Sequence, residues 1–240
     1  MELTKDSKIS EVVANDYRTA KVFKNHSIDF CCQGNRSLTS ACEDKNIAVE
    51  QILDELKTIL NDSTDDTSGF NSWQLDELAE YIEKKHHRYC EEKITEIKPY
   101  LEKITQVHGQ SHPELYEISA IFSETAGQMS AHMKKEELLI FPFIKRLVKL
   151  KEEGGKLPKA RFNSDQNPID LMLKDHNDEG ERFRKIRELS KNYEIPEDAC
   201  STYRVSLALL HEFEEDLHEH IHLENNILFP KSIALEKELV

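Results

Sequence analysis

The hydrophobic positions of this 240-residue chain follow helical rather than strand periodicity. Near the N-terminus they predict short helices within residues 8–23, 38–45 and 48–60. Four longer patterns follow, and they cover Trp73–Val107, Pro113–Leu150, Pro168–Leu189 and Ala199–Leu228. Four long helices in two pairs predict an antiparallel four-helix bundle. The expected fold class is therefore all-α, with a small N-terminal helical domain followed by the bundle.

A polar stretch, NDSTDDTSGFNS, separates the short helices from the long ones. It contains small and charged residues without periodicity, which is typical of a linker. We therefore expect an N-terminal domain over residues 1–60, a linker over residues 61–72 and the bundle over residues 73–240. The small number of glycines and prolines, seven of each, also favours long helices over a turn-rich β fold.

Composition excludes several classes of function. The formal net charge of −14 repels phosphate backbones, so we expect no nucleic-acid binding. No apolar run is long enough to cross a bilayer, and the first residues, MELTKDSKIS, lack the apolar region of a signal peptide. Five cysteines, an odd number, are typical of thiols in a reducing compartment. A cytoplasmic protein without membrane contact is expected.

Two segments of the predicted bundle repeat each other. HMKKEELLIFP begins at His132 and HIHLENNILFP begins at His220, and both contain His-x-x-x-Glu followed by Phe-Pro. One helix earlier, a further histidine precedes each copy, His86 in the first half and His176 in the second. The pattern predicts an internal duplication in which each half supplies one histidine and one His-x-x-x-Glu pair.

Helical phase indicates which of these side chains face the core. At about 100° per residue, His86 falls on the side of Leu75 and Ile82, whereas His87 falls about 100° away. We therefore interpret His87 as a surface or packing residue. The same count places five further residues inward: His132, Glu136, His176, His220 and Glu224.

The alignment of the two copies separates close alternatives. Glu137 aligns with Asn225, so Glu136 is the expected functional glutamate and Glu137 is not. His222 aligns with Lys134 and is expected in solvent.

Six inward imidazole and carboxylate groups point to a metal centre. A single buried histidine is more often a hydrogen-bonded core residue, but six such groups without compensation would destabilise the fold strongly. Two metal ions would compensate all six. We expect His86 and His132 on one ion and His176 and His220 on the other, with Glu136 and Glu224 bridging both. Imidazole and carboxylate without thiolate favour two iron ions with an oxo or hydroxo bridge; manganese or zinc is the alternative.

The order His-x-x-x-Glu resembles hemerythrin-like proteins. With KKHHRY, KDHNDEGE and HIHLENNILFP, the two halves resemble the hemerythrin-like domain of the repair of iron centres family. The stretch SIDFCCQGNRSLTSAC resembles that family's short N-terminal domain, which is marked by a Cys-Cys-Gly-Gly turn. Gln33 stands where the family usually has glycine, and it would be strained if that position required a positive φ.

This resemblance implies a di-iron protein that repairs iron–sulfur clusters after nitrosative or oxidative stress, with damaged iron–sulfur proteins as partners. A role in redox chemistry or iron transfer is expected for Cys31 and Cys32. Adjacent Cα atoms lie about 3.8 Å apart, too close for an unstrained disulfide, so free thiols are expected. Packing in a turn is the alternative for this pair.

Two other functions remain open at the level of sequence. Ferrous pairs bind nitric oxide, so a nitric oxide-binding or nitric oxide-reducing enzyme is one alternative. A hemerythrin-like module that binds or senses oxygen is the other, although hemerythrins generally have five histidines and an asymmetric ligand set.

Overall fold

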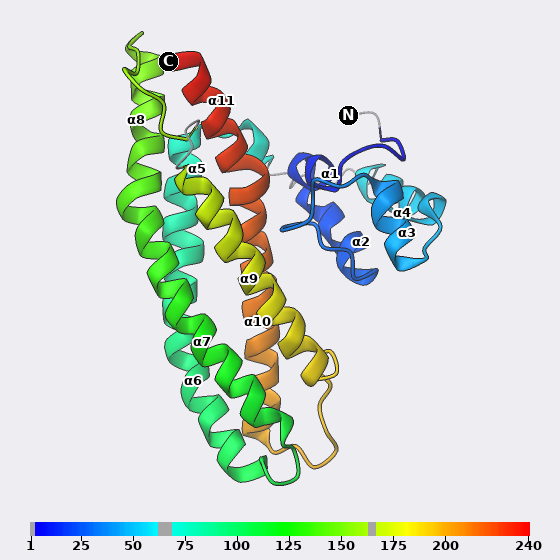
Figure 1. Ribbon diagram of the computed structural model, residues 1–240. Helices are drawn as coiled ribbons and strands as arrows, with labels where there is room; N and C mark the ends of the chain where they lie inside the picture. The colour runs from blue at the N-terminus through cyan, green and yellow to red at the C-terminus, as the bar shows by residue number, and fades with distance from the viewer. Residues whose placement is uncertain (1–2, 62–68, 163–166) are drawn as a thin grey trace.

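The computed structural model describes residues 3–61, 69–162 and 167–240. Its regular elements in these ranges are helices, which confirms the predicted all-α class (Figure 1). Most of the predicted linker, residues 62–68, lies outside the described residues. No helix in the described ranges is long and apolar enough to cross a membrane.

The N-terminal unit consists of short helices whose buried side chains belong to the same apolar cluster as part of the bundle. Its elements are α1 (Ile9–Asn15), the 3₁₀ turn η1 (Tyr17–Thr19), α2 (Ala20–Asn25), α3 (Leu38–Lys45) and α4 (Val49–Asn61). Helix α3 begins where the Ser37 hydroxyl accepts a hydrogen bond from the Ser40 N–H, as is typical of an N-cap. The buried side chains of Ile9, Phe23 and Leu38 contribute to the core.

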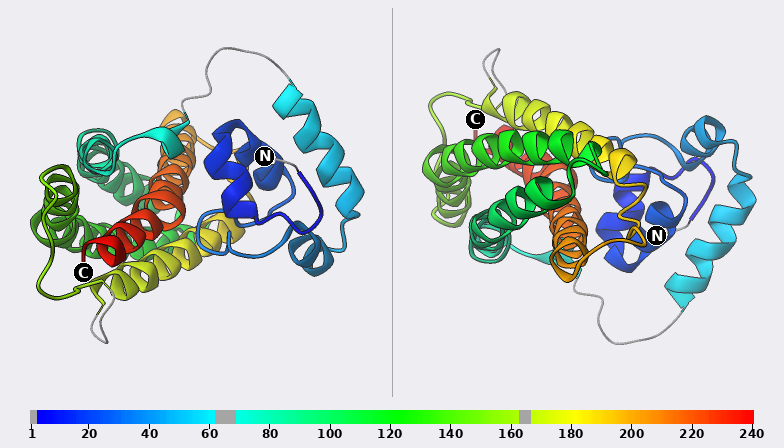
Figure 2. Two further views of the ribbon diagram at one scale, coloured as in Figure 1. Left: turned by 90° about the horizontal axis from the view of Figure 1, so that it is seen from above. Right: turned by 90° about the horizontal axis from the view of Figure 1, so that it is seen from below.

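Four long helical rods form the bundle, preceded by the 3₁₀ turn η2 (Phe70–Ser72). Three of them contain a π-helical turn, and Figure 2 shows the rods from both ends. The first rod is α5 (Leu75–Ile82), η3 (Glu83–His87) and α6 (Arg88–His108). The second is α7 (Glu114–Lys135), η4 (Glu136–Ile140) and α8 (Phe141–Glu152). The third is α9 (Pro168–Leu189), and the fourth is α10 (Ser201–Leu223), η5 (Glu224–Leu228) and α11 (Phe229–Leu239).

Two of the π-helical turns, which are wider than α-helical turns, have a clear cause in the sequence. Pro142 follows η4 and Pro230 follows η5, at the start of α8 and α11. Proline has no N–H for the carbonyl four residues earlier, and a wide turn accommodates this mismatch without ending the rod. The predicted end of the fourth helix at Leu228 was therefore wrong, because the rod continues through Pro230 to Leu239.

The N-terminal unit packs against the bundle through α1, which contacts α10 and η5. The rings of Tyr17 and Phe30 lie against the ring of His222, which is 1% exposed. The prediction that His222 is solvated was wrong, since the N-terminal unit covers this side chain. Two ion pairs also join the units, Lys24 with Glu215 and Arg184 with Asp29.

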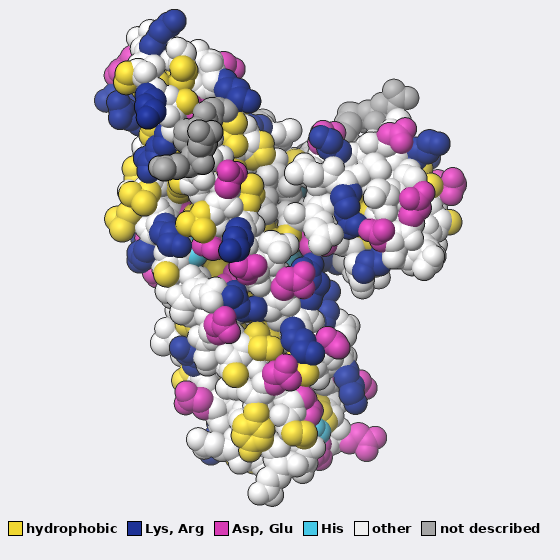
Figure 3. Space-filling view, in the orientation of Figure 1, with side chains coloured by type: hydrophobic (Ala, Val, Ile, Leu, Met, Phe, Trp, Pro, Cys, Tyr) yellow, Lys and Arg dark blue, Asp and Glu magenta, His cyan; other side chains and the backbone are white. Residues whose placement is uncertain are grey.

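The outer surface is highly charged and the histidines are mostly hidden. On the face in Figure 3, acidic and basic side chains are interspersed and histidine is scarcely visible. This agrees with burial of the histidines that concern the function.

Candidate metal centre

The π-helical turns deliver buried imidazole and carboxylate groups to one place in the bundle. Glu136 and Glu224 are the first residues of η4 and η5, and both are fully buried. His132 and His220 lie one turn before them, at the ends of α7 and α10. The other two histidines are His87, at the end of η3, and His176, on α9.

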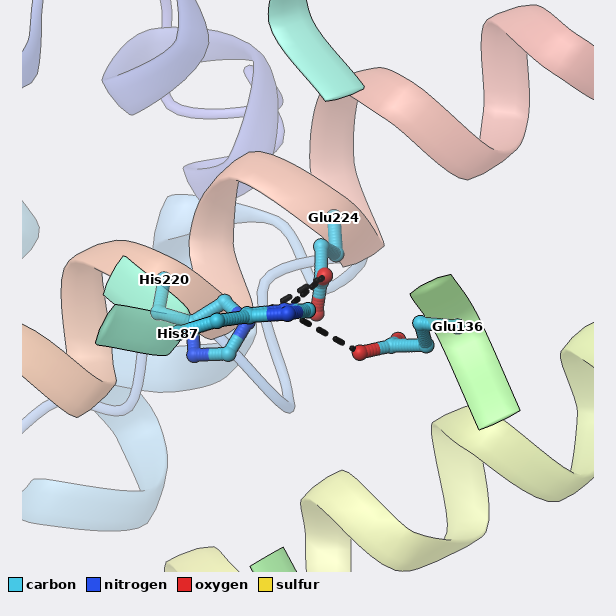
Figure 4. Close-up of side chains that lie close together, drawn as sticks. All are labelled: His87, Glu136, His220 and Glu224. Atoms are coloured by element: carbon cyan, nitrogen blue, oxygen red, sulfur yellow. Dashed lines mark ion pairs between the residues drawn. The ribbon is translucent and has the colours of Figure 1, made fainter. Parts of the chain in front are cut away.

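These six residues form two groups, each of two histidines and two glutamates. In each group the ligand atoms lie within 4.8 Å of one another, and both groups contain Glu136 and Glu224. One group adds His132 and His176. The other adds His87 and His220, and Figure 4 shows these two rings beside the two carboxylates.

The carboxylates are oriented as bridges between the two groups. Glu136 directs Oε1 at His132 Nε2, 3.2 Å away, and Oε2 at His87 Nε2, 3.4 Å away. Glu224 directs Oε2 at His176 Nε2, 3.1 Å away, and Oε1 at His220 Nε2, 3.2 Å away. Each glutamate thus offers one oxygen to each pair of histidines, as two neighbouring cations require. The chain has a di-metal site.

The pairing of the histidines differs from the one predicted by sequence. His132 lies with His176, their Nε2 atoms 2.9 Å apart, and His87 lies with His220. Each metal position therefore takes one histidine from each half of the duplication. The reason is the packing of the rods, since α7 lies against α9 and α6 lies against α10.

His86 is not brought into either group, and His87 takes the place expected for it. The His86 Nδ1 atom lies 3.0 Å from Asp216 Oδ1, and the ring stacks on His220 with centroids 5.6 Å apart. The prediction assumed a regular helix, whereas the π-helical turn η3 changes the phase at these two residues. The adjacent histidines in KKHHRY were the signal, but the sequence does not show which of the two faces the site.

A layer of hydrogen-bond partners holds the histidine rings. His87 Nδ1 lies 3.0 Å from Glu137 Oε1, and His176 Nδ1 lies 2.7 Å from Asn225 Oδ1. Such partners fix the tautomer and direct the other nitrogen, Nε2, at a metal. The alignment of the two copies excluded Glu137 as a metal ligand, because it has no glutamate counterpart in the second copy. Glu137 instead holds the ring of His87.

The electrostatics of the site favour bound cations. Burial opposes the charge on Glu136 and Glu224, yet the surrounding histidines lower the pKa of both carboxyl groups. Burial also opposes protonation of His87, but the nearby carboxylates of Glu136 and Glu224 raise its pKa to about 10. Within the described ranges, the oxygens of both glutamates are buried without a hydrogen bond. Metal ions would satisfy these oxygens, and imidazole with carboxylate suits a divalent transition metal.

Sequence reasoning missed Glu179, a buried acid on the helix that carries His176. It lies on α9 one turn after His176, is 2% exposed, and accepts a hydrogen bond from Arg182 Nη1 at 2.8 Å. Burial raises the pKa of Glu179 to about 7. Its spacing of three residues from His176 was visible in the sequence, but the spacing alone could not show burial.

The adjacent cysteines are free thiols with Sγ atoms 3.7 Å apart. Asp29 Oδ1 accepts N–H hydrogen bonds from Cys31, Cys32 and Gln33 and so holds the loop. The hydrogen bond with Cys32, together with burial, raises the pKa of the Cys31 thiol well above its usual value. Gln33 does not have a positive φ, so the strain considered for this position does not arise.

The segment Asp29–Gln33, called the thiol loop from here on, lies directly against α9 and η5. Cys32 Sγ is 3.5 Å from the backbone oxygen of His176. A Cβ atom at Gly180 would lie 3.2 Å from the same sulfur, so glycine leaves the room that the thiol uses. Asn225 Nδ2 donates a hydrogen bond to the Cys31 carbonyl at 3.2 Å.

Comparison with known proteins agrees with this architecture. Residues 5–60 match the ScdA_N domain, described as a domain of unknown function, and residues 79–232 match the hemerythrin HHE cation binding domain. The iron-sulfur cluster repair protein ScdA of Staphylococcus epidermidis is 31% identical over 230 residues, which cover 95% of this chain and 99% of that protein. ScdA of Staphylococcus haemolyticus is 32% identical over 231 residues, with the same coverage.

A relative from another genus gives the same result. The iron-sulfur cluster repair protein YtfE of Yersinia pestis is 32% identical over 225 residues, which cover 91% of this chain and 93% of that protein. These similarities extend over both the thiol-bearing unit and the di-metal bundle, and they confirm the resemblance inferred from the sequence motifs. The chain belongs to the family of iron–sulfur cluster repair proteins that includes ScdA and YtfE.

Proposed function

We propose that this protein repairs iron–sulfur clusters damaged by nitrosative or oxidative stress, and that it does so by donating iron. The observation that carries the proposal is the pair of bridging carboxylates between two histidine pairs. Beside them, the Cys32 thiol lies against the backbone of His176 on α9. The relatives' names supply the process, cluster repair. The partners are then damaged iron–sulfur proteins of the cytoplasm.

Six side chains would hold the iron, namely His87, His132, Glu136, His176, His220 and Glu224. Imidazole and carboxylate donors without thiolate suit iron, and the relatives' role in iron–sulfur cluster repair favours iron over manganese or zinc. Ferrous iron also lies low in the Irving–Williams order, so such a site holds it less firmly than copper or zinc. A protein that donates iron needs a site that can release it.

Cys31 and Cys32 are the proposed acceptors of iron on its way out of the bundle. Their sulfurs and one Asp29 oxygen lie within 4.8 Å of one another, which is close enough to share a cation. Thiolate ligands are soft and suit iron destined for a cluster. Since the loop already contacts α9, transfer needs little movement of the N-terminal unit.

The test is reactivation of a damaged enzyme. A dehydratase whose [4Fe–4S] cluster has been destroyed by nitric oxide is incubated without oxygen with inorganic sulfide, a thiol reductant and the ferrous-loaded protein. Activity should return faster than with free ferrous iron at equal concentration, and more slowly with Cys31→Ser/Cys32→Ser. Equal rates with the protein and with free iron would refute donation. Nitrous oxide production during the same incubation would instead support a nitric oxide reductase.

A further inference from the structure

The duplication places different residues at equivalent positions behind two of the site histidines. Glu137 directly follows one bridging glutamate, and Asn225 directly follows the other. Glu137 lies against Nδ1 of His87, and Asn225 lies against Nδ1 of His176. Glu137 offers only acceptor oxygens. Asn225 offers an acceptor and a donor, and the structure uses both.

The two ends of the Asn225 amide connect different parts of the protein. Oδ1 lies 2.7 Å from His176 Nδ1, while Nδ2 donates to the Cys31 carbonyl at 3.2 Å. A carboxylate at this position could hold His176 but would repel the Cys31 carbonyl oxygen. One side chain therefore connects the orientation of a metal-site histidine to the position of the thiol loop.

The two cysteines of the thiol loop lie beside one of the two metal positions. Among the described residues, Cys32 Sγ lies against the His176 backbone oxygen and against Gly180, and the Cys31 carbonyl accepts from Asn225 Nδ2; these residues belong to or adjoin the His132–His176 position. Aromatic rings pack on both positions, since His87 stacks on Phe141, His220 on His86 and His176 on Phe229. The thiol contacts, rather than burial, therefore distinguish the His132–His176 position from the His87–His220 position.

We propose that Asn225 is a positioning residue that ties the Cys31–Cys32 loop to the His132–His176 position, and so makes this position the one that exchanges metal with the thiols. The inference rests on the proposed function, because it concerns how iron leaves the bundle. It adds that the two positions are inequivalent and that Asn225 controls the more labile one.

Metal release to a chromogenic ferrous chelator tests this without any repair activity. The ferrous-loaded protein should release iron in two phases of about one ion each. His132→Gln should remove the fast phase and His87→Gln the slow one, which identifies the positions. In Asn225→Asp the fast phase should slow by about tenfold, because repulsion of the Cys31 carbonyl moves the thiols away and a carboxylate beside Nδ1 makes His176 a stronger ligand. The slow phase should be unchanged.

Asn226 provides a matched control. Its Nδ2 atom donates to the Phe30 carbonyl at 3.1 Å, so it tethers the same segment, but it contacts His222 rather than a site histidine. Asn226→Asp should leave both phases unchanged. If Asn225→Asp does not fold, Asn225→Ser, which removes both contacts, should also slow the fast phase, because the Cys31 carbonyl is no longer held beside this position.

The inference is wrong if release has a single phase, or if Asn225→Asp and Asn226→Asp slow the fast phase equally. Its failure is distinguishable from failure of the proposed function. Two-phase release controlled by Asn225 could occur in a protein that reactivates no enzyme, and reactivation could occur with single-phase release.

Discussion

At the scale of single residues, adjacent histidines on one rod have different roles. His87 Nε2 faces both bridging glutamates. His86 instead is hydrogen-bonded to Asp216 and stacks on the site histidine His220. Both rings are almost fully buried, so burial alone does not distinguish a ligand from a packing residue. The direction of the ring nitrogens does, and that direction depends on one wide turn in the backbone.

Metal analysis of two single variants tests this difference. We expect two iron ions per chain in the wild-type protein and in His86→Gln, and about one in His87→Gln, because only His87 faces the glutamates. The two substitutions are adjacent and chemically identical, so each is the control for the other. Equal iron loss in both variants, or loss only in His86→Gln, would contradict the structural assignment.

At the scale of elements, helix α9 is the surface on which the thiol loop rests. Gly180 and Gly127 both lie inside long helices, α9 and α7. A Cβ at Gly127 would meet nothing within 4 Å, whereas one at Gly180 would meet Cys32 Sγ. The two glycines therefore separate the effect of helix propensity from the effect of thiol packing.

Alanine at these two positions should have different effects. Gly127→Ala should raise the free energy of unfolding by roughly 0.5–1 kcal/mol, the usual gain inside a helix. Gly180→Ala should gain less, because Cys32 must move by a few tenths of an ångström, and alkylation of Cys32 should become faster. Denaturant unfolding and timed alkylation measure the two effects. An equal gain in both variants with unchanged alkylation would show that Cys32 does not pack closely on α9.

At the scale of the whole molecule, the metal site joins all four rods. Its six side chains come from η3, the α7–η4 junction, α9 and the α10–η5 junction. Without metal, two buried carboxylates face each other with only histidines to compensate their charge. Bound cations remove this repulsion and connect the two halves of the duplication, so metal and stability of the bundle are coupled.

Removing the metal should therefore lower the melting temperature. At a free ferrous concentration of about 1,000 times Kd, one bound ion contributes about 4 kcal/mol. For a chain of this size, each bound ion then raises Tm by roughly 8–16 °C. Thermal unfolding with and without a chelator, under nitrogen, measures the shift. Glu136→Gln/Glu224→Gln should lose the shift; a shift retained in this variant would place the stabilising metal elsewhere.

Local patterns along the chain suffice for the helical class, the duplicated His-x-x-x-Glu segments and the adjacent thiols. These features are local, since periodicity and residue spacing do not depend on distant contacts. The sequence also identified five of the residues that meet at the site, because α7, α9 and α10 are regular as far as the start of η4 and η5; these five are His132, Glu136, His176, His220 and Glu224. It did not determine how the histidines pair between the halves.

Only the tertiary structure decided the remaining features. The choice of His87 over His86 depends on η3, a wide turn without a following proline to signal it, unlike η4 and η5. The pairing of His132 with His176 depends on which rods are neighbours. The contact of the thiol loop with His176 and Asn225 joins residues far apart in the chain. Long-range packing fixes all three, and no local pattern encodes it.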